Sequence, residues 1–168
     1  DVNNAIARYL AILQSNPNDS EAHYNLGLAL HVRGNVDEAI SHYRKALDIN
    51  PRFAQAHRNL GFILAKQGKI GEAIERLQTA IEINPRYAEP HLDLGRIMLA
   101  QGKLDDAISH FEGAIRIKPD YADAHCNLGV AFEGKGMIGE AAEEYREAIR
   151  LQPDLGPAHA NLAADLYY

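Results

Sequence analysis

Residues 22–27 read AHYNLG, and closely similar hexapeptides follow it at intervals of 34 residues. The later copies are AHRNLG from residue 56, PHLDLG from 90, AHCNLG from 124 and AHANLA from 158. Five prolines keep the same spacing, at Pro17, Pro51, Pro85, Pro119 and Pro153. So many columns in one register indicate an internally repeated fold, in which each repeat is one supersecondary unit.

The period divides the chain into complete and partial repeats. Complete repeats are predicted at 20–53, 54–87, 88–121 and 122–155. Residues 1–19 match the second half of a preceding repeat, and residues 156–168 match the first half of a following one. We therefore interpret 1–168 as a single array. Because it opens and closes on half a repeat, we expect it to be a piece of a longer protein.

Within a repeat, the apolar residues follow the three-and-four spacing of amphipathic helices. In the first repeat Leu26 and Leu30 share one such face, and Ile40 and Leu47 share a second. Gly34 lies between them and suits the left-handed conformation that ends a helix. The Asn-Pro step that follows stops the second helix, because a residue before proline is disfavoured in the α region. Each repeat is therefore predicted to be two helices of roughly 13 residues joined by a glycine turn.

These columns resemble the tetratricopeptide repeat (TPR) over the whole chain. In the first repeat the resemblance is carried by Leu26, Gly27, Leu30, Ala39, Tyr43, Ala46 and Pro51. The consistent departure is a histidine where the family often has Trp or Tyr, at His23, His57, His91, His125 and His159. The resemblance implies an all-α fold, a right-handed superhelical α-solenoid of stacked antiparallel helix pairs. It also implies that the first helix of each repeat lines a concave face.

One column on that expected concave face is polar. It consists of Asn25, Asn59, Asp93, Asn127 and Asn161. Asparagine is unfavourable inside a helix, because its side chain competes for backbone hydrogen bonds. An amide offers both a donor and an acceptor, so it can hold a peptide backbone. The column resembles the asparagine ladder in the TPR superhelix of O-linked N-acetylglucosamine transferase, which holds extended polypeptide. The alternative is that these amides tie neighbouring helices together.

Further side chains are expected beside this column. We predict that Tyr24, Arg58, Phe62, Leu92 and Arg96 select the side chains of the ligand. The predicted function is a protein–protein interaction scaffold that binds an extended peptide or protein segment, of unidentified sequence, in the concave groove. One alternative is a TPR region that presents substrate to a larger glycosyltransferase-type enzyme. Another is a self-assembling structural scaffold.

Composition and missing motifs argue against other classes of protein. The net charge is -6 and the 17 Lys and Arg residues are scattered, so we expect no nucleic-acid partner. No apolar run is long enough to insert into a membrane. The chain contains no phosphate-binding loop, zinc-protease or nucleophile-elbow signature. We therefore expect no enzyme activity and no cofactor in these residues. No signal-peptide pattern is present, and a targeting segment could lie outside this piece. The compartment is not identified; we expect a soluble protein, with a cytoplasmic setting favoured.

Eight histidines and one cysteine raise the question of a metal or catalytic site. Equivalent histidines of the column should lie about 10 Å apart on neighbouring helices. Zinc ligands lie about 2.0–2.1 Å from one ion, so the column predicts packing and no metal. His31, His42 and His110 are predicted at the surface. Cys126 has no activating base at a suitable position, so we do not expect it to be a nucleophile.

The terminal helices lack a neighbouring repeat on one side. The first exposes Leu10, and the last carries Leu162, Leu166, Tyr167 and Tyr168. Natural arrays close with polar capping helices, so we expect these ends to associate in concentrated solution. Light scattering that showed a strict monomer at high concentration would contradict this expectation.

Overall fold

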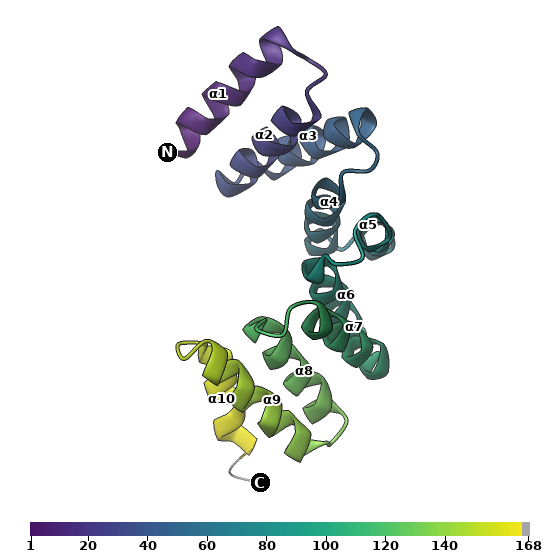
Figure 1. The fold of residues 1–168 in the computed structure, drawn as a ribbon, viewed down its shortest axis with the longest axis vertical. Helices are drawn as coiled ribbons and strands as arrows, with labels where there is room; N and C mark the ends of the chain where they lie inside the picture. Colours follow the sequence, from purple (N-terminus) through teal and green to yellow (C-terminus); the bar gives the residue numbers. More distant parts are fainter. Residues whose placement is uncertain (166–168) are drawn as a thin grey trace. The chain divides into compact units, whose positions relative to one another are not determined.

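The computed structural model describes residues 1–165, which form ten α-helices and contain no strand (Figure 1). The helices are α1 (Val2–Ser15), α2 (Ser20–Val32), α3 (Val36–Ile49), α4 (Ala54–Lys66), α5 (Ile70–Ile83), α6 (Ala88–Ala100), α7 (Leu104–Ile117), α8 (Ala122–Gly134), α9 (Ile138–Leu151) and α10 (Gly156–Asp165). The prediction of an all-α repeated fold is confirmed. Leu166, Tyr167 and Tyr168 lie outside the described residues.

The helices of a repeat alternate in length. The even-numbered helices α2 to α8 have 13 residues, and the odd-numbered helices α3 to α9 have 14. Between the two helices of each repeat, a glycine takes a positive φ. The φ angles are 89° at Gly34, 77° at Gly68, 71° at Gly102 and 76° at Gly136. The predicted left-handed glycine turn is therefore confirmed. Glycine occupies this position because it alone adopts a positive φ without a steric cost.

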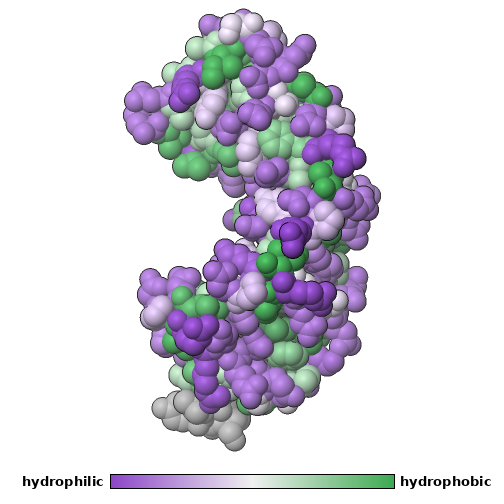
Figure 2. Space-filling model, in the orientation of Figure 1, coloured by the Kyte–Doolittle hydropathy of each residue, from purple (hydrophilic) through white to green (hydrophobic). Residues whose placement is uncertain are grey.

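The helices form two compact units, residues 1–85 and 86–168. In the first unit α2 packs with α3 and α4 with α5, while α1 packs on α2 and α3 on α4. In the second unit α6 packs with α7 and α8 with α9, while α7 packs on α8 and α10 on α9. On the face drawn in Figure 2, hydrophilic residues cover most of the surface, with hydrophobic residues in small patches. Among residues 1–165, no helix combines the length and apolar character needed to cross a bilayer.

In each complete repeat, a glycine of the first helix lies against a large side chain of the second helix. A Cβ added to Gly27 would lie 2.8 Å from Cε1 of Tyr43, and one added to Gly129 would lie 2.6 Å from Cε1 of Tyr145. Both tyrosine rings are fully buried. Glycine in a helix costs about 1 kcal/mol relative to alanine. The close packing of a large side chain of the second helix accounts for that cost.

Candidate functional site

In the first unit, α2 and α4 bring four of the predicted ligand-contact residues together. The Asn59 amide Nδ2 donates to the Tyr24 hydroxyl at 3.1 Å. The Arg58 guanidinium Nη1 donates to Oδ1 of Asn59 at 3.2 Å. Phe62 lies one turn further along α4, in contact with Arg58. The Asn59 amide is therefore engaged at both ends and ties α4 to α2.

Phe62 lies between two cations. The Arg58 guanidinium carbon is 5.2 Å from the ring centroid, and Nζ of Lys66 is 4.5 Å from it. Both distances are within the range of cation–π attraction. Lys66 was not among the predicted residues, although positions 58, 62 and 66 repeat every four residues and so share one helix face. We call Tyr24, Arg58, Asn59, Phe62 and Lys66 the α2–α4 surface.

The electrostatic character of this surface is positive. The His31 ring centroid is 6.4 Å from that of Phe62. Burial lowers the pKa of His31, and the positive charges of Lys66 and Arg58 lower it further. Tyr24 packs against Phe53, with ring centroids 4.7 Å apart. Burial raises the pKa of Tyr24, so its hydroxyl keeps its proton at neutral pH. The surface therefore combines a fixed phenol, a half-buried aromatic ring and two cations.

In the second unit, two of the predicted residues are buried. Leu92 is 2% exposed and Asp93 is 4% exposed. Leu92 belongs to a core cluster with Phe111 and Leu128, so the prediction that it contacts a ligand is wrong. Helical spacing assigned its column to the open face, but Leu92 lies among core residues of α7 and α8. Arg96 is exposed and pairs with Asp123 across α6 and α8 at 3.6 Å.

The side-chain amides of the asparagine column differ in their hydrogen-bond partners. Asn127 donates from Nδ2 to the backbone oxygen of Asp123 at 2.7 Å, within its own helix. Asn25 is half-buried, and its amide makes no hydrogen bond to any residue in 1–165. Asn161 is also half-buried. One amide therefore ties two helices, one bonds to its own helix, and Asn25 remains available. No sequence signal distinguishes these cases, because the residue type is the same in each.

The histidine column connects four of the first helices, α2, α4, α8 and α10, to the loops before them. Nε2 donates to the backbone oxygen of the proline six residues earlier in four repeats. The distances are 3.0 Å for His23, 2.9 Å for His57, 3.0 Å for His125 and 2.8 Å for His159. His31, His42 and His110 are half-buried, so each still reaches the surface in part. Cys126 is buried, and burial raises the pKa of its thiol, which keeps it protonated and unreactive.

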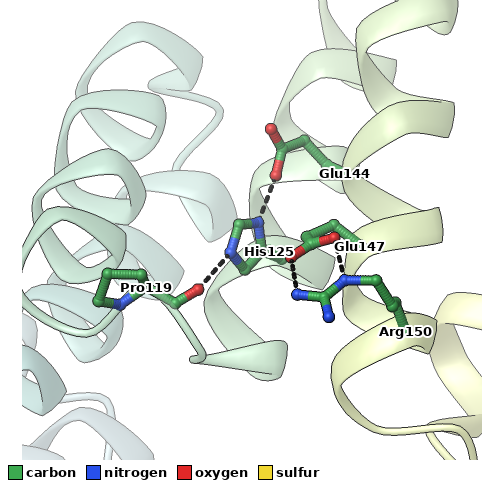
Figure 3. A network of polar contacts seen from close by, with 5 residues as sticks. All are labelled: Pro119, His125, Glu144, Glu147 and Arg150. Carbon is green, nitrogen blue, oxygen red and sulfur yellow. Dashed lines mark hydrogen bonds and ion pairs between the residues drawn. The ribbon is translucent and has the colours of Figure 1, made fainter.

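His125 differs from the other column histidines because a carboxylate faces it (Figure 3). Its Nδ1 lies 2.6 Å from Oε2 of Glu144, while Nε2 bonds to the Pro119 oxygen. The hydrogen bond to Glu144 is the main cause that raises the pKa of His125, and burial opposes it. Glu147, which is bound by Arg150, raises it further. In the protonated form of His125, both ring nitrogens donate, one to Glu144 and the other to the Pro119 oxygen.

Profiles of known repeat families match most of the chain. The profile described as TPR repeat matches residues 29–68, 63–102 and 95–136. Two profiles described as tetratricopeptide repeat match residues 9–41 and 122–155. The chain belongs to the tetratricopeptide repeat family. Repeats of the TPR family are typically non-catalytic and mediate interactions between proteins.

Solved TPR structures share this fold. MamA is 31% identical with a TM-score of 0.80, and the match covers 91% of this chain and 90% of MamA. YrrB, described as a TPR protein with an unusual peptide-binding site, is 31% identical with a TM-score of 0.74, over 95% of this chain and 82% of YrrB. The pilF protein of Pseudomonas aeruginosa is 25% identical with a TM-score of 0.82, over 88% of this chain and 68% of pilF. No curated protein matches the chain. The TPR array is an all-α helical repeat solenoid and a protein-interaction scaffold.

Proposed function

We propose that this TPR array binds an extended segment of another protein along its first helices, with the α2–α4 surface as the main contact in the first unit. The observation that carries this proposal is the placement of Phe62 between Arg58 and Lys66, beside the Tyr24–Asn59 hydrogen bond. Aromatic residues and arginine dominate the energy of protein interfaces. Here they are already held by contacts within the chain, which reduces the entropy lost on binding.

The polar groups of the first unit suit a peptide backbone. The Asn25 amide has a donor and an acceptor that no residue in 1–165 uses. Tyr24 accepts from Asn59, which leaves its hydroxyl proton for another acceptor. The Asn59 oxygen has a second lone pair beside the one used by Arg58. The peptide-binding site named for YrrB, at 31% identity, supports the same use of the fold here.

The charge of the surface favours one class of ligand side chain. Lys66 and Arg58 both contact the Phe62 ring, and their charges reach His31. An acidic side chain of the ligand would gain electrostatic attraction here, and a basic one would be repelled. We therefore expect the bound segment to carry an Asp or Glu residue near an apolar side chain that packs on Phe62.

Replacing Asn59 and Asn127 together with alanine should weaken peptide binding about tenfold, because two hydrogen bonds of about 0.5–1.5 kcal/mol each are lost. The melting temperature should fall by only a few degrees, since the Asn59–Tyr24 bond is half-buried and the Asn127 bond is local. The probe is a short peptide selected from a random library on the whole chain. Fluorescence anisotropy measures its binding to each variant.

Asn25→Ala is the companion variant, because it removes an amide without breaking any bond among residues 1–165. It should weaken the same peptide and leave the melting temperature unchanged. Asn4→Ala is the control, since Asn4 is exposed on α1 and far from α4 in the repeat pattern. If the double variant instead loses several kcal/mol of unfolding free energy and Asn25→Ala binds normally, the asparagines are structural and the backbone-binding role is wrong.

A further inference from the structure

Two histidines of the column pair with a second histidine that lies 19 residues later in the chain. Nδ1 of His23 on α2 is 2.9 Å from Nδ1 of His42 on α3. Nδ1 of His91 on α6 is 3.5 Å from Nδ1 of His110 on α7. The ring centroids are 5.1 Å apart in the first pair and 5.7 Å apart in the second. Comparing equivalent histidines of neighbouring repeats in the sequence misses these pairs, because both histidines of a pair lie within one repeat.

The nitrogen separations match those of two ligands on one metal ion. Two imidazole nitrogens bound at 2.0–2.1 Å, with an angle of 90–110° at the ion, lie about 2.8–3.4 Å apart. The His23–His42 separation of 2.9 Å falls inside this range, and the His91–His110 separation of 3.5 Å lies just above it. The spacing of both pairs suits a shared ion, and each ring has to rotate so that its Nδ1 lone pair points at an ion beside the line between the two nitrogens.

The first pair also has the outer support that metal-bound histidines use. Nε2 of His23 donates to the backbone oxygen of Pro17 at 3.0 Å, so the Nδ1 lone pair faces His42. Metal-ligating histidines usually make such a bond through their other nitrogen, which fixes the tautomer and the ring. Without an ion, His42 must supply the proton between the two Nδ1 atoms. With an ion bound, that proton leaves Nδ1 and His42 carries one on Nε2 instead.

The first pair has open space beside its nitrogens, and the second is packed more closely. His23 and His42 line a cavity of about 630 Å³, together with Gln14, Asn18 and Asp48, which leaves room for water on an ion. Lys45 also lines this cavity and opposes a cation there, while Asp48 favours one. At the second pair, a Cβ on Gly113 would lie 3.0 Å from Nδ1 of His91. The α7 backbone at Gly113 therefore packs closely against that nitrogen.

We propose that the His23–His42 and His91–His110 pairs each chelate a late first-row divalent metal ion, such as Zn²⁺, through their two Nδ1 atoms. Imidazole suits Zn²⁺, Cu²⁺ and Ni²⁺, whereas Mg²⁺ and Ca²⁺ prefer oxygen ligands. Among residues 1–165 no group of three or more His, Cys, Asp or Glu side chains is placed to hold a metal. Water completes the coordination, and the ions exchange freely instead of holding the fold together.

The remaining repeats provide matched controls at the same position. His57 is followed 19 residues later by Arg76, and His125 by Glu144. His42→Arg and His110→Arg therefore introduce a residue that the second repeat already carries at this place. A cation cannot ligate a metal, and its charge repels one. His31→Ala is the control for nonspecific binding, because His31 is half-buried and belongs to neither pair.

Isothermal titration of the whole chain with ZnCl₂ at neutral pH tests the proposal. We expect two ions per chain, one for each pair, and His31→Ala should keep both. Each single arginine variant should lose one site, with at least a tenfold fall in its affinity, and the double variant should lose both. A double variant that melts like the wild type and still binds two ions overturns the proposal.

A second measurement needs no variant. In ¹⁵N spectra of the histidine rings of the wild-type chain, Zn²⁺ should shift the Nδ1 signals of His23, His42, His91 and His110. The signals of His57 and His159 should stay in place, because neither has a histidine partner. Equal shifts of all the histidines, or none, would show that no paired site exists, whatever the stability of the arginine variants.

Discussion

Replacing Gly95 with alanine should lower the free energy of unfolding by about 2–3 kcal/mol. The added Cβ would lie 2.6 Å from Cδ1 and 2.9 Å from Cζ of Phe111, a ring that is fully buried. Overpacking of a rigid core costs about 1–3 kcal/mol and occasionally more. Alanine regains about 1 kcal/mol of helix propensity, but this gain is smaller than the cost of displacing an aromatic ring. Urea unfolding followed by circular dichroism measures the change.

Two further variants isolate the packing contribution. Gly71→Ala adds the same methyl group to α5, where no atom outside its own stretch of helix backbone lies within 4 Å. The free energy of unfolding should therefore stay constant or rise by about 0.5 kcal/mol. Phe111→Leu recreates the pair formed by Gly61 and Leu77 in the second repeat. In the Gly95→Ala background it should recover about 1–2 kcal/mol relative to the additive expectation. If the effects of the two changes on the free energy of unfolding are additive, the clash with Phe111 is not the cause of the stability lost in Gly95→Ala.

The repeated columns predict the fold well because each reflects a local rule. The turn glycines meet a requirement for positive φ, and the mid-helix glycines meet a close approach by Tyr43 or its equivalents. Both requirements recur with the repeat, so counting columns in one sequence is enough to find them. The helices α2, α4, α6 and α8 begin at Ser20, Ala54, Ala88 and Ala122, which are the first residues of the four complete repeats.

The candidate site is less predictable, because it depends on the residues that differ between repeats. The column of Tyr24 also contains Arg58 and Leu92. Tyr24 accepts a hydrogen bond from the asparagine of the next repeat, whereas Leu92 has no polar atom and is buried in the core. Alignment of the repeats treats these positions as equivalent and therefore places Leu92 on the face predicted to bind a ligand. Only the packing in three dimensions separates a residue that binds from one that supports the core.

Replacing Glu144 with glutamine should destabilise the protein by about 1.5–2 kcal/mol in mildly acidic solution. The 2.6 Å contact between Glu144 and Nδ1 of His125 joins a carboxylate to an imidazolium whose other nitrogen already bonds to Pro119. The His125 side chain is 10% exposed and that of Glu144 is 25% exposed, so solvent screens the pair only partly. A hydrogen bond between charged partners is worth about 1.5–3 kcal/mol, and a neutral amide keeps only part of that value.

The sign of the pH dependence follows from the direction of the His125 shift. Its pKa is raised in the folded protein, chiefly by the hydrogen bond to Glu144 and also by Glu147. The stabilisation is therefore fully present below the unfolded value of about 6.5, and it is lost as the pH rises through the raised pKa. His42, His57 and His91 have lowered pKa values, chiefly through burial, so their contribution has the opposite sign and is lost as the pH falls below about 6.5.

The difference between wild type and Glu144→Gln isolates His125 from these opposing groups, because both proteins carry the same other histidines. Urea unfolding at a series of pH values should give a difference that is largest below about pH 6.5 and shrinks towards alkaline pH. Glu143→Gln removes the same charge from an exposed neighbour on α9, so its difference from wild type should be small at every pH. A Glu144→Gln difference that grew with pH would show that His125 is neutral in the folded protein. The carboxylate would then stabilise the helix pair by some route other than the imidazolium.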